Sequence, residues 1–150
     1  MSEKRRWFNH CLNSAFDRWN IRDFEATEFA PERREPPPEH RALMIVPTAL
    51  VLQDLRNAGC GVITINSGYR DPQYNESVGG APNSQHILFT AADITTRNWT
   101  PDRVADWLDA SEWSRLIGMG RYNSFTHIDT RHWKGNPDYG VGPARWDKRH

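Results

Sequence analysis

Two histidines and one aspartate are placed where they can hold a metal ion together. His86 and Asp93 lie on either side of a predicted loop-to-strand transition, and His127 follows in a later alternating apolar run. Two imidazoles and one carboxylate are the usual protein ligands of a catalytic zinc, which keeps its fourth position open for water. A structural zinc needs four protein ligands, often thiolates, and this chain has only 2 cysteines. We therefore predict a zinc site formed by these three residues.

Arg70 and Asp129 are the charged residues best placed to act beside such a metal. Arg70 follows a short β-rich run, and its guanidinium can bind a substrate carboxylate or stabilise a developing oxyanion. The alternative for Arg70 is an ion pair with the neighbouring Asp71. Asp129 shares a predicted strand face with His127, because side chains alternate along a strand. Asp129 can serve as a general base in hydrolysis, or it can orient a ligand imidazole instead.

The elements that position these residues follow from hydrophobic spacing and from Pro and Gly. Helices are predicted over 5–19, from Pro47 to about Gly59 and from Pro101, and strands over 62–65, 91–94, 116–119 and 124–130. Residues 71–85 are predicted to form a long loop, and the tail from Lys134 an ordered wrap rather than a core element. This pattern predicts one α+β domain over residues 1–150, with a small antiparallel sheet that carries the zinc site and is flanked by helices.

Composition excludes several other classes of protein. Lys plus Arg and Asp plus Glu both number 19, so the chain lacks the basic excess expected of a nucleic-acid binder. No segment is long and apolar enough to cross a bilayer, and polar residues interrupt the stretch from Trp7 to Trp19, so no secretory signal is predicted. Cys11 and Cys60 are expected to be buried thiols in a reducing compartment, with a disulfide or a ligand role as the alternative.

Four motifs carry a resemblance to a known family. They are Ser67-Gly68-Tyr69-Arg70, the stretch from Asn75 to His86, Ala91-Ala92-Asp93, and Phe125-Thr126-His127-Ile128-Asp129. In this order they resemble the zinc D-Ala-D-Ala carboxypeptidase family, whose members include murein endopeptidases and phage endolysins. The resemblance covers roughly residues 20–133 and implies zinc as the cofactor, with the ligands named above.

Two residues depart from the family pattern. Phe89 stands where the family has a glycine, and a phenylalanine is strained wherever a glycine is needed for a positive φ. Some branches place an acidic residue three positions before the last histidine, and here that residue is Ser124. Glu76 and the acidic residues between Glu32 and Glu39 are the next candidates for a general base if Asp129 has neither role.

The function that the resemblance implies is zinc-dependent hydrolysis of an amide bond in peptidoglycan peptides. The bond can be a terminal D-Ala, a cross-link or an L-Ala–D-Glu bond, so both carboxypeptidase and endopeptidase activities fit. We expect synthesis in the cytosol and action at the cell wall after release, or from within a virion, as in a phage endolysin. The alternative is a non-catalytic phage structural or binding module that keeps the peptidase fold.

Overall fold

A computed structural model describes residues 1–136 and 143–150 of the chain. The α-helices are α1 (Glu3–Arg18), α2 (Ala26–Phe29), α3 (Val46–Leu55), α4 (Pro72–Ser77) and α5 (Pro101–Ala110). The strands are β1 (Ile63–Ser67), β2 (Ala91–Thr96), β3 (Gly118–Arg121), β4 (Thr126–Asp129) and β5 (Ala144–Asp147). Short 3-10 or π turns form η1 (Glu39–Arg41), η2 (Arg56–Cys60) and η3 (Ser114–Leu116). Helices around one small sheet confirm the predicted α+β class.

The strand order within the described residues is β1-β2-β4-β3-β5. The first four strands pair antiparallel, as predicted, whereas β5 pairs parallel to β3 and makes the sheet mixed. The prediction of a tail without a core element was therefore wrong for residues 144–147. The Ala144–Asp147 segment has no β-branched residue to indicate a strand, and pairing with β3 overrides its weak propensity. Residues 137–142 of the predicted wrap lie outside the described residues.

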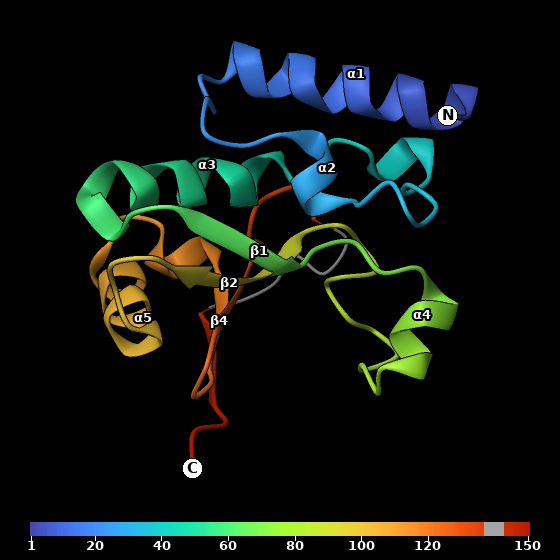
Figure 1. Ribbon diagram of the computed structural model, residues 1–150. Coiled ribbons are helices and arrows are strands. Elements are labelled where there is room, and N and C mark those ends of the chain that lie inside the picture. The colour runs from blue at the N-terminus through green and yellow to red at the C-terminus, as the bar shows by residue number, and fades with distance from the viewer. Residues whose placement is uncertain (137–142) are drawn as a thin grey trace.

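The two faces of the sheet have different surroundings. Ala92, Ile94, Met119 and Ile128 belong to the buried core that α3 and α5 also form. Asp93, His127 and Asp129 alternate with these residues along β2 and β4, so they lie on the opposite face. Figure 1 shows α1, α2 and α3 on one side of β1 and the short helix α4 projecting away from the other helices.

The first helix anchors the segment rich in charge and proline that follows it. Helix α1 begins at Glu3, two residues before the predicted start, because Ser2 caps it and its Oγ accepts a hydrogen bond from Arg5 N. The buried guanidinium of Arg5 donates hydrogen bonds to the carbonyl oxygens of Ala30, Pro31 and Arg34 at 2.7–2.9 Å. The helix therefore holds this segment against the body of the protein.

One predicted loop contains a helix. Residues 72–77 form α4, where Asp71 is the N-cap, its Oδ1 accepting a hydrogen bond from Tyr74 N at 2.8 Å, and Pro72 is the first helical residue. An Asp followed by Pro is a usual helix start, but the two glycines downstream made a loop the stronger expectation. The helix predicted from Pro47 consists of α3 and the π turn η2 that follows it. It stops at the predicted residue, because Gly59 has a non-helical φ of 107°. Among the described helices, none has the length and apolar character to cross a membrane.

Candidate metal centre

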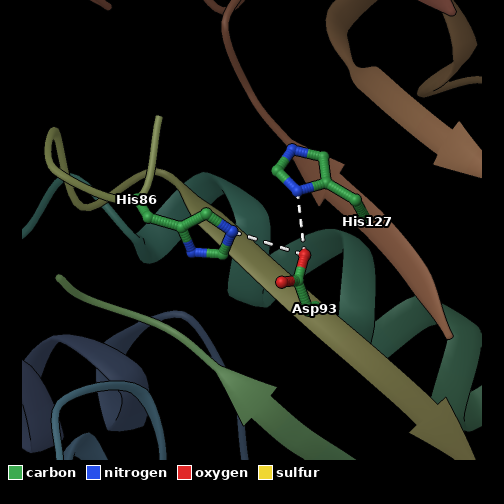
Figure 2. A group of neighbouring side chains, drawn as sticks. All are labelled: His86, Asp93 and His127. Atoms are coloured by element: carbon green, nitrogen blue, oxygen red, sulfur yellow. Dashed lines mark hydrogen bonds and ion pairs between the residues drawn. The ribbon is translucent and has the colours of Figure 1, made fainter. Parts of the chain in front are cut away.

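The three predicted ligands converge on one point of the open face of the sheet. One ligand atom from each of His86, Asp93 and His127 lies within 4.8 Å of the others. Figure 2 shows both imidazoles directing a ring nitrogen toward the same oxygen of Asp93. That oxygen, Oδ1, is 3.3 Å from His86 Nε2 and 2.9 Å from His127 Nδ1. His86 comes from the loop before β2, Asp93 from β2 itself and His127 from β4, which pairs with β2 in register.

Hydrogen bonds on the far side of each ring orient the imidazoles. His86 Nδ1 lies 2.7 Å from the carbonyl oxygen of Gly68, so this nitrogen carries the proton and donates. His127 Nε2 lies 2.8 Å from Asp129 Oδ2, so here Nε2 is the donor. The remaining nitrogen of each ring is directed toward Asp93 Oδ1, and after loss of its proton it could present a lone pair to an ion bound there. Such outer hydrogen bonds are the usual way in which a protein fixes the tautomer of a metal-binding histidine.

The donor set and its spacing fit zinc. Donors at about 2.0–2.2 Å from a tetrahedral zinc lie roughly 3.4 Å apart. The separation of 3.3 Å between His86 Nε2 and Asp93 Oδ1 matches that value, and the 2.9 Å to His127 Nδ1 is the length of a hydrogen bond without the ion. Two nitrogens and one carboxylate oxygen from buried or half-buried side chains therefore provide three of the four ligand atoms of a zinc site.

Buried carboxylates dominate the electrostatics around His127. Burial alone would raise the pKa of Asp93, but hydrogen bonds to His127 and His86 outweigh it and hold that pKa well below its ordinary value. The pKa of His127 lies above its ordinary value, because the hydrogen bonds to Asp129 and Asp93 more than offset the effect of burial. A cation at this point would thus meet a site that already carries negative charge.

The guanidinium of Arg70 lies beside the three ligands rather than against the carboxylate of Asp71. Its Nη2 is 3.5 Å from Asp93 Oδ2, and its Nε and Nη1 donate to Ser67 Oγ at 3.1 Å and Asn75 Oδ1 at 3.4 Å. Asp71, the alternative ion-pair partner, uses its carboxylate to cap α4 instead. The strand end at Ser67 and the buried Asn75 of α4 therefore aim the guanidinium at the metal-binding face.

Asp129 has no free oxygen with which to take up a proton. The carboxylate is fully buried, and it accepts hydrogen bonds from His127 Nε2 and from the backbone N, Nε and Nη2 of Arg131 at 2.8–3.0 Å. Burial alone would raise the pKa of Asp129, but these hydrogen bonds lower it well below the ordinary range. Asp129 also sits across the imidazole from Asp93. This geometry favours the role of orienting His127 over the role of general base.

Phe89 keeps the backbone conformation that a glycine would have at its position. Its φ is 60°, in the left-handed region, and its side chain is fully buried between the rings of Phe8 and Tyr69, with centroids 5.8 Å away in each case. A left-handed L-residue costs about 1–2 kcal/mol, and burial of a phenylalanine returns about 1.5–3 kcal/mol. The departure at Phe89 is therefore compatible with an intact loop beside His86.

Sequence reasoning placed the ligands and Arg70 but missed Arg131 and Trp146. Arg131 binds Asp129 with two side-chain nitrogens, and the Trp146 ring lies 5.0 Å from that of His127. The alternating glycines Gly118 and Gly120 were the available signal, because glycine inside a strand often marks a close approach of other groups. The other candidate bases contact helix α1 or lie in solvent: Glu32 meets Asn9, Glu35 meets Lys4 and Glu76 is exposed.

Comparison with known proteins agrees with this geometry. The sequence model of the family described as peptidase M15 matches residues 12–129, which include all three ligands. The zinc D-Ala-D-Ala carboxypeptidase of Streptomyces albus G is 33% identical over an alignment of 96 residues, which covers 60% of this chain and 37% of that protein. The chain therefore matches little more than a third of its relative's length.

Proposed function

Because the chain belongs to the peptidase M15 family, we propose that it is a zinc-dependent peptidase that hydrolyses an amide bond in peptidoglycan peptides. The observation that carries the proposal is the convergence of His86, Asp93 and His127 with the guanidinium of Arg70 directly beside them. The relative from Streptomyces albus G is named for zinc and for D-Ala-D-Ala carboxypeptidase activity, which agrees with the donor set found here.

Each side chain of the site would have a separate role in hydrolysis. A bound zinc ion would supply a Lewis acid that polarises the scissile carbonyl and promotes attack by water. His86 and His127 would hold that ion through Nε2 and Nδ1, because Gly68 O and Asp129 bind the opposite nitrogens of the two rings. Arg70 offers N–H groups at the same place, where it would hold negative charge that develops on the carbonyl oxygen or sits on a substrate carboxylate.

The finer parts of the proposal are which peptide bond is cut and where the protein acts. A guanidinium suited to a terminal carboxylate favours removal of a terminal D-Ala, while a charge-stabilising Arg70 fits an endopeptidase equally. The phage endolysin hypothesis, with cytosolic synthesis and action at the wall after release or from within a virion, belongs to this proposal. No basic excess supports a nucleic-acid partner, because the formal net charge is zero.

Purified peptidoglycan provides the decisive substrate. Zinc-loaded protein should release soluble products from it, and chelator treatment should abolish release until zinc is restored. Mass spectrometry of the products identifies the bond, because free alanine and released peptides differ in mass. The His86→Ala variant is the matched negative. Arg145→Lys should remain active, because the Arg145 side chain binds Asp109, Ile117 and Ser114 rather than a ligand. Absence of products from a protein that holds a full zinc equivalent would overturn the proposal.

A non-catalytic module is the second candidate, and specific residues favour it. Ser124 stands where some relatives carry an acid, and the Asp129 carboxylate is already saturated with hydrogen bonds. Such a protein would bind zinc and peptidoglycan without cutting it. Sedimentation of the zinc-loaded protein with insoluble peptidoglycan, with no soluble product, would select this alternative.

A further inference from the structure

One cross-strand row of side chains connects the metal centre to the C-terminal strand. The pairings Asp93–His127, His127–Gly120 and Gly120–Trp146 run in register across β2, β4, β3 and β5. Residues directly opposite each other on neighbouring strands point to the same face of a sheet. Trp146 is therefore directed to the face that carries the ligands, although it lies beyond the part of the chain that the family model matches.

Glycine at position 120 lets the tryptophan reach the ligand. A methyl group on Gly120 would come within 2.2 Å of Trp146 Nε1, so any larger side chain would push the indole away. Through this gap the indole ring lies 5.0 Å from the ring of His127, and its Nε1 donates to Tyr122 Oη at 3.1 Å. The hydrogen bond fixes the plane of the indole, and the indole in turn limits the rotation of the imidazole.

A second glycine makes room for the arginine behind the same imidazole. A methyl group on Gly118 would lie 2.5 Å from Arg131 Nε and 2.7 Å from Asp129 Oδ1. The guanidinium of Arg131 occupies this space and donates hydrogen bonds to both carboxylate oxygens of Asp129. One of these oxygens, Oδ2, also accepts the hydrogen bond from His127 Nε2. The guanidinium carbon of Arg131 lies 5.2 Å from the centroid of the Trp146 ring, so the two groups also support each other.

We propose that Arg131 and Trp146 are positioning residues of the metal centre, Arg131 acting through Asp129 and Trp146 directly on the imidazole of His127. This inference rests on the proposed zinc site, but not on which bond the protein cuts or on whether it cuts one. Neither residue is a ligand. Their contribution is to hold His127 Nδ1 aimed at Asp93, so their loss should weaken zinc binding without unfolding the protein.

Conservative variants test the two residues. Arg131→Lys keeps the charge but cannot occupy both carboxylate oxygens with one planar fork. Its zinc affinity, measured by competition with a fluorescent chelator, should fall roughly 10–100-fold. Trp146→Phe keeps a ring but loses the bond to Tyr122, and we expect a weakening of roughly two- to tenfold. The absorption spectrum of the cobalt-loaded protein should shift in both variants, because it reports the ligand geometry.

Matched controls separate positioning from general stability. Arg145→Lys changes a different arginine, on β5, whose hydrogen-bond partners are Ser114, Ile117 and Asp109, and it should leave zinc affinity and the cobalt spectrum unchanged. The melting temperature of each metal-free variant is recorded beside its affinity. In an Asp129→Asn background, Arg131→Lys should have little further effect on zinc affinity, because the proposed route through Asp129 is already cut.

The inference fails if Arg131→Lys and Trp146→Phe bind zinc as tightly as the wild type, with an unchanged cobalt spectrum. It also fails if Arg145→Lys weakens binding equally, or if the effects of Arg131→Lys and Asp129→Asn simply add. A wild-type protein that holds zinc through His127 yet leaves peptidoglycan intact would overturn the proposed function while leaving this inference standing. The two failures are therefore distinguishable in one set of proteins.

Discussion

The two faces of the sheet use the same strands for opposite purposes. On β4, Ile128 is fully buried in the core with Ala92 and Met119, whereas its neighbours His127 and Asp129 belong to the polar layer of the metal centre. The core face depends on apolar area and close packing, which many residue combinations can supply. The metal face depends on single atoms placed within a few tenths of an ångström. A one-residue step along the strand therefore changes the kind of damage that a mutation causes.

The largest effect is expected on the metal face. His127→Ala removes a ligand from the centre of the site, and the protein should lose tight zinc binding. Elemental analysis of the purified variant, with His86→Ala beside it, measures this directly. Full zinc occupancy in both variants would mean that the assigned ligands are wrong.

The neighbouring residue should show the reverse behaviour. Ile128→Ala leaves a cavity between the sheet and the helices, and we expect it to lower the free energy of unfolding by about 2–5 kcal/mol. Because Ile128 faces away from the ligands, the folded variant should still bind one zinc ion. Urea unfolding of the metal-free protein and a zinc titration measure the two quantities. Loss of zinc from the folded variant would show that the two faces are not independent.

Arg70→Lys tests chemistry on the metal face without touching a ligand. Lysine keeps a positive charge but loses the fork, so turnover on peptidoglycan peptides should fall by about 10²–10³, the usual cost of one oxyanion donor. Zinc occupancy should remain complete. Steady-state kinetics with the Arg145→Lys control distinguish this loss from a general effect. Turnover at the wild-type level would assign Arg70 a structural role.

Phe89 belongs to the buried core and lies in the loop between His86 and β2, and its replacement should have the smallest effect. Phe89→Gly loses about 3–5 kcal/mol of packing and recovers about 1–2 kcal/mol of backbone strain, so a net destabilisation of about 1–4 kcal/mol is expected. Denaturant unfolding of the metal-free protein measures it. A variant more stable than the wild type would show that strain at Phe89 exceeds the gain from its burial against Phe8 and Tyr69.

Local patterns in the sequence account for most of the elements of the fold. The first helix, the strand at Ala91 and the hairpin that bears His127 all follow from spacing and from caps or turn residues. The joint placement of His86, Asp93 and His127 rests on motif order as well, because a lone histidine has many roles. The cofactor prediction of zinc is confirmed by the family and by the donor set.

Local sequence patterns do not predict the features that depend on pairing between distant parts of the chain. The parallel pairing of β5 with β3 has no local signal, so nothing near Trp146 indicated that its ring would reach His127. The saturation of Asp129 by Arg131 depends on the room left by Gly118, which only the sheet register shows. For this reason the sequence left the role of Asp129 undecided, whereas the structure favours one of the two alternatives.

The parallel pairing of β5 also has a consequence for the order of events during folding. A hairpin such as β3–β4 closes a short loop and forms in about 1–10 μs, whereas the parallel pairing of β5 with β3 must close a longer loop and is slower. The strand that carries His127 can therefore pair with its neighbour before β5 joins the sheet. When β5 docks onto the edge of β3, it brings Trp146 against an imidazole that is already in place.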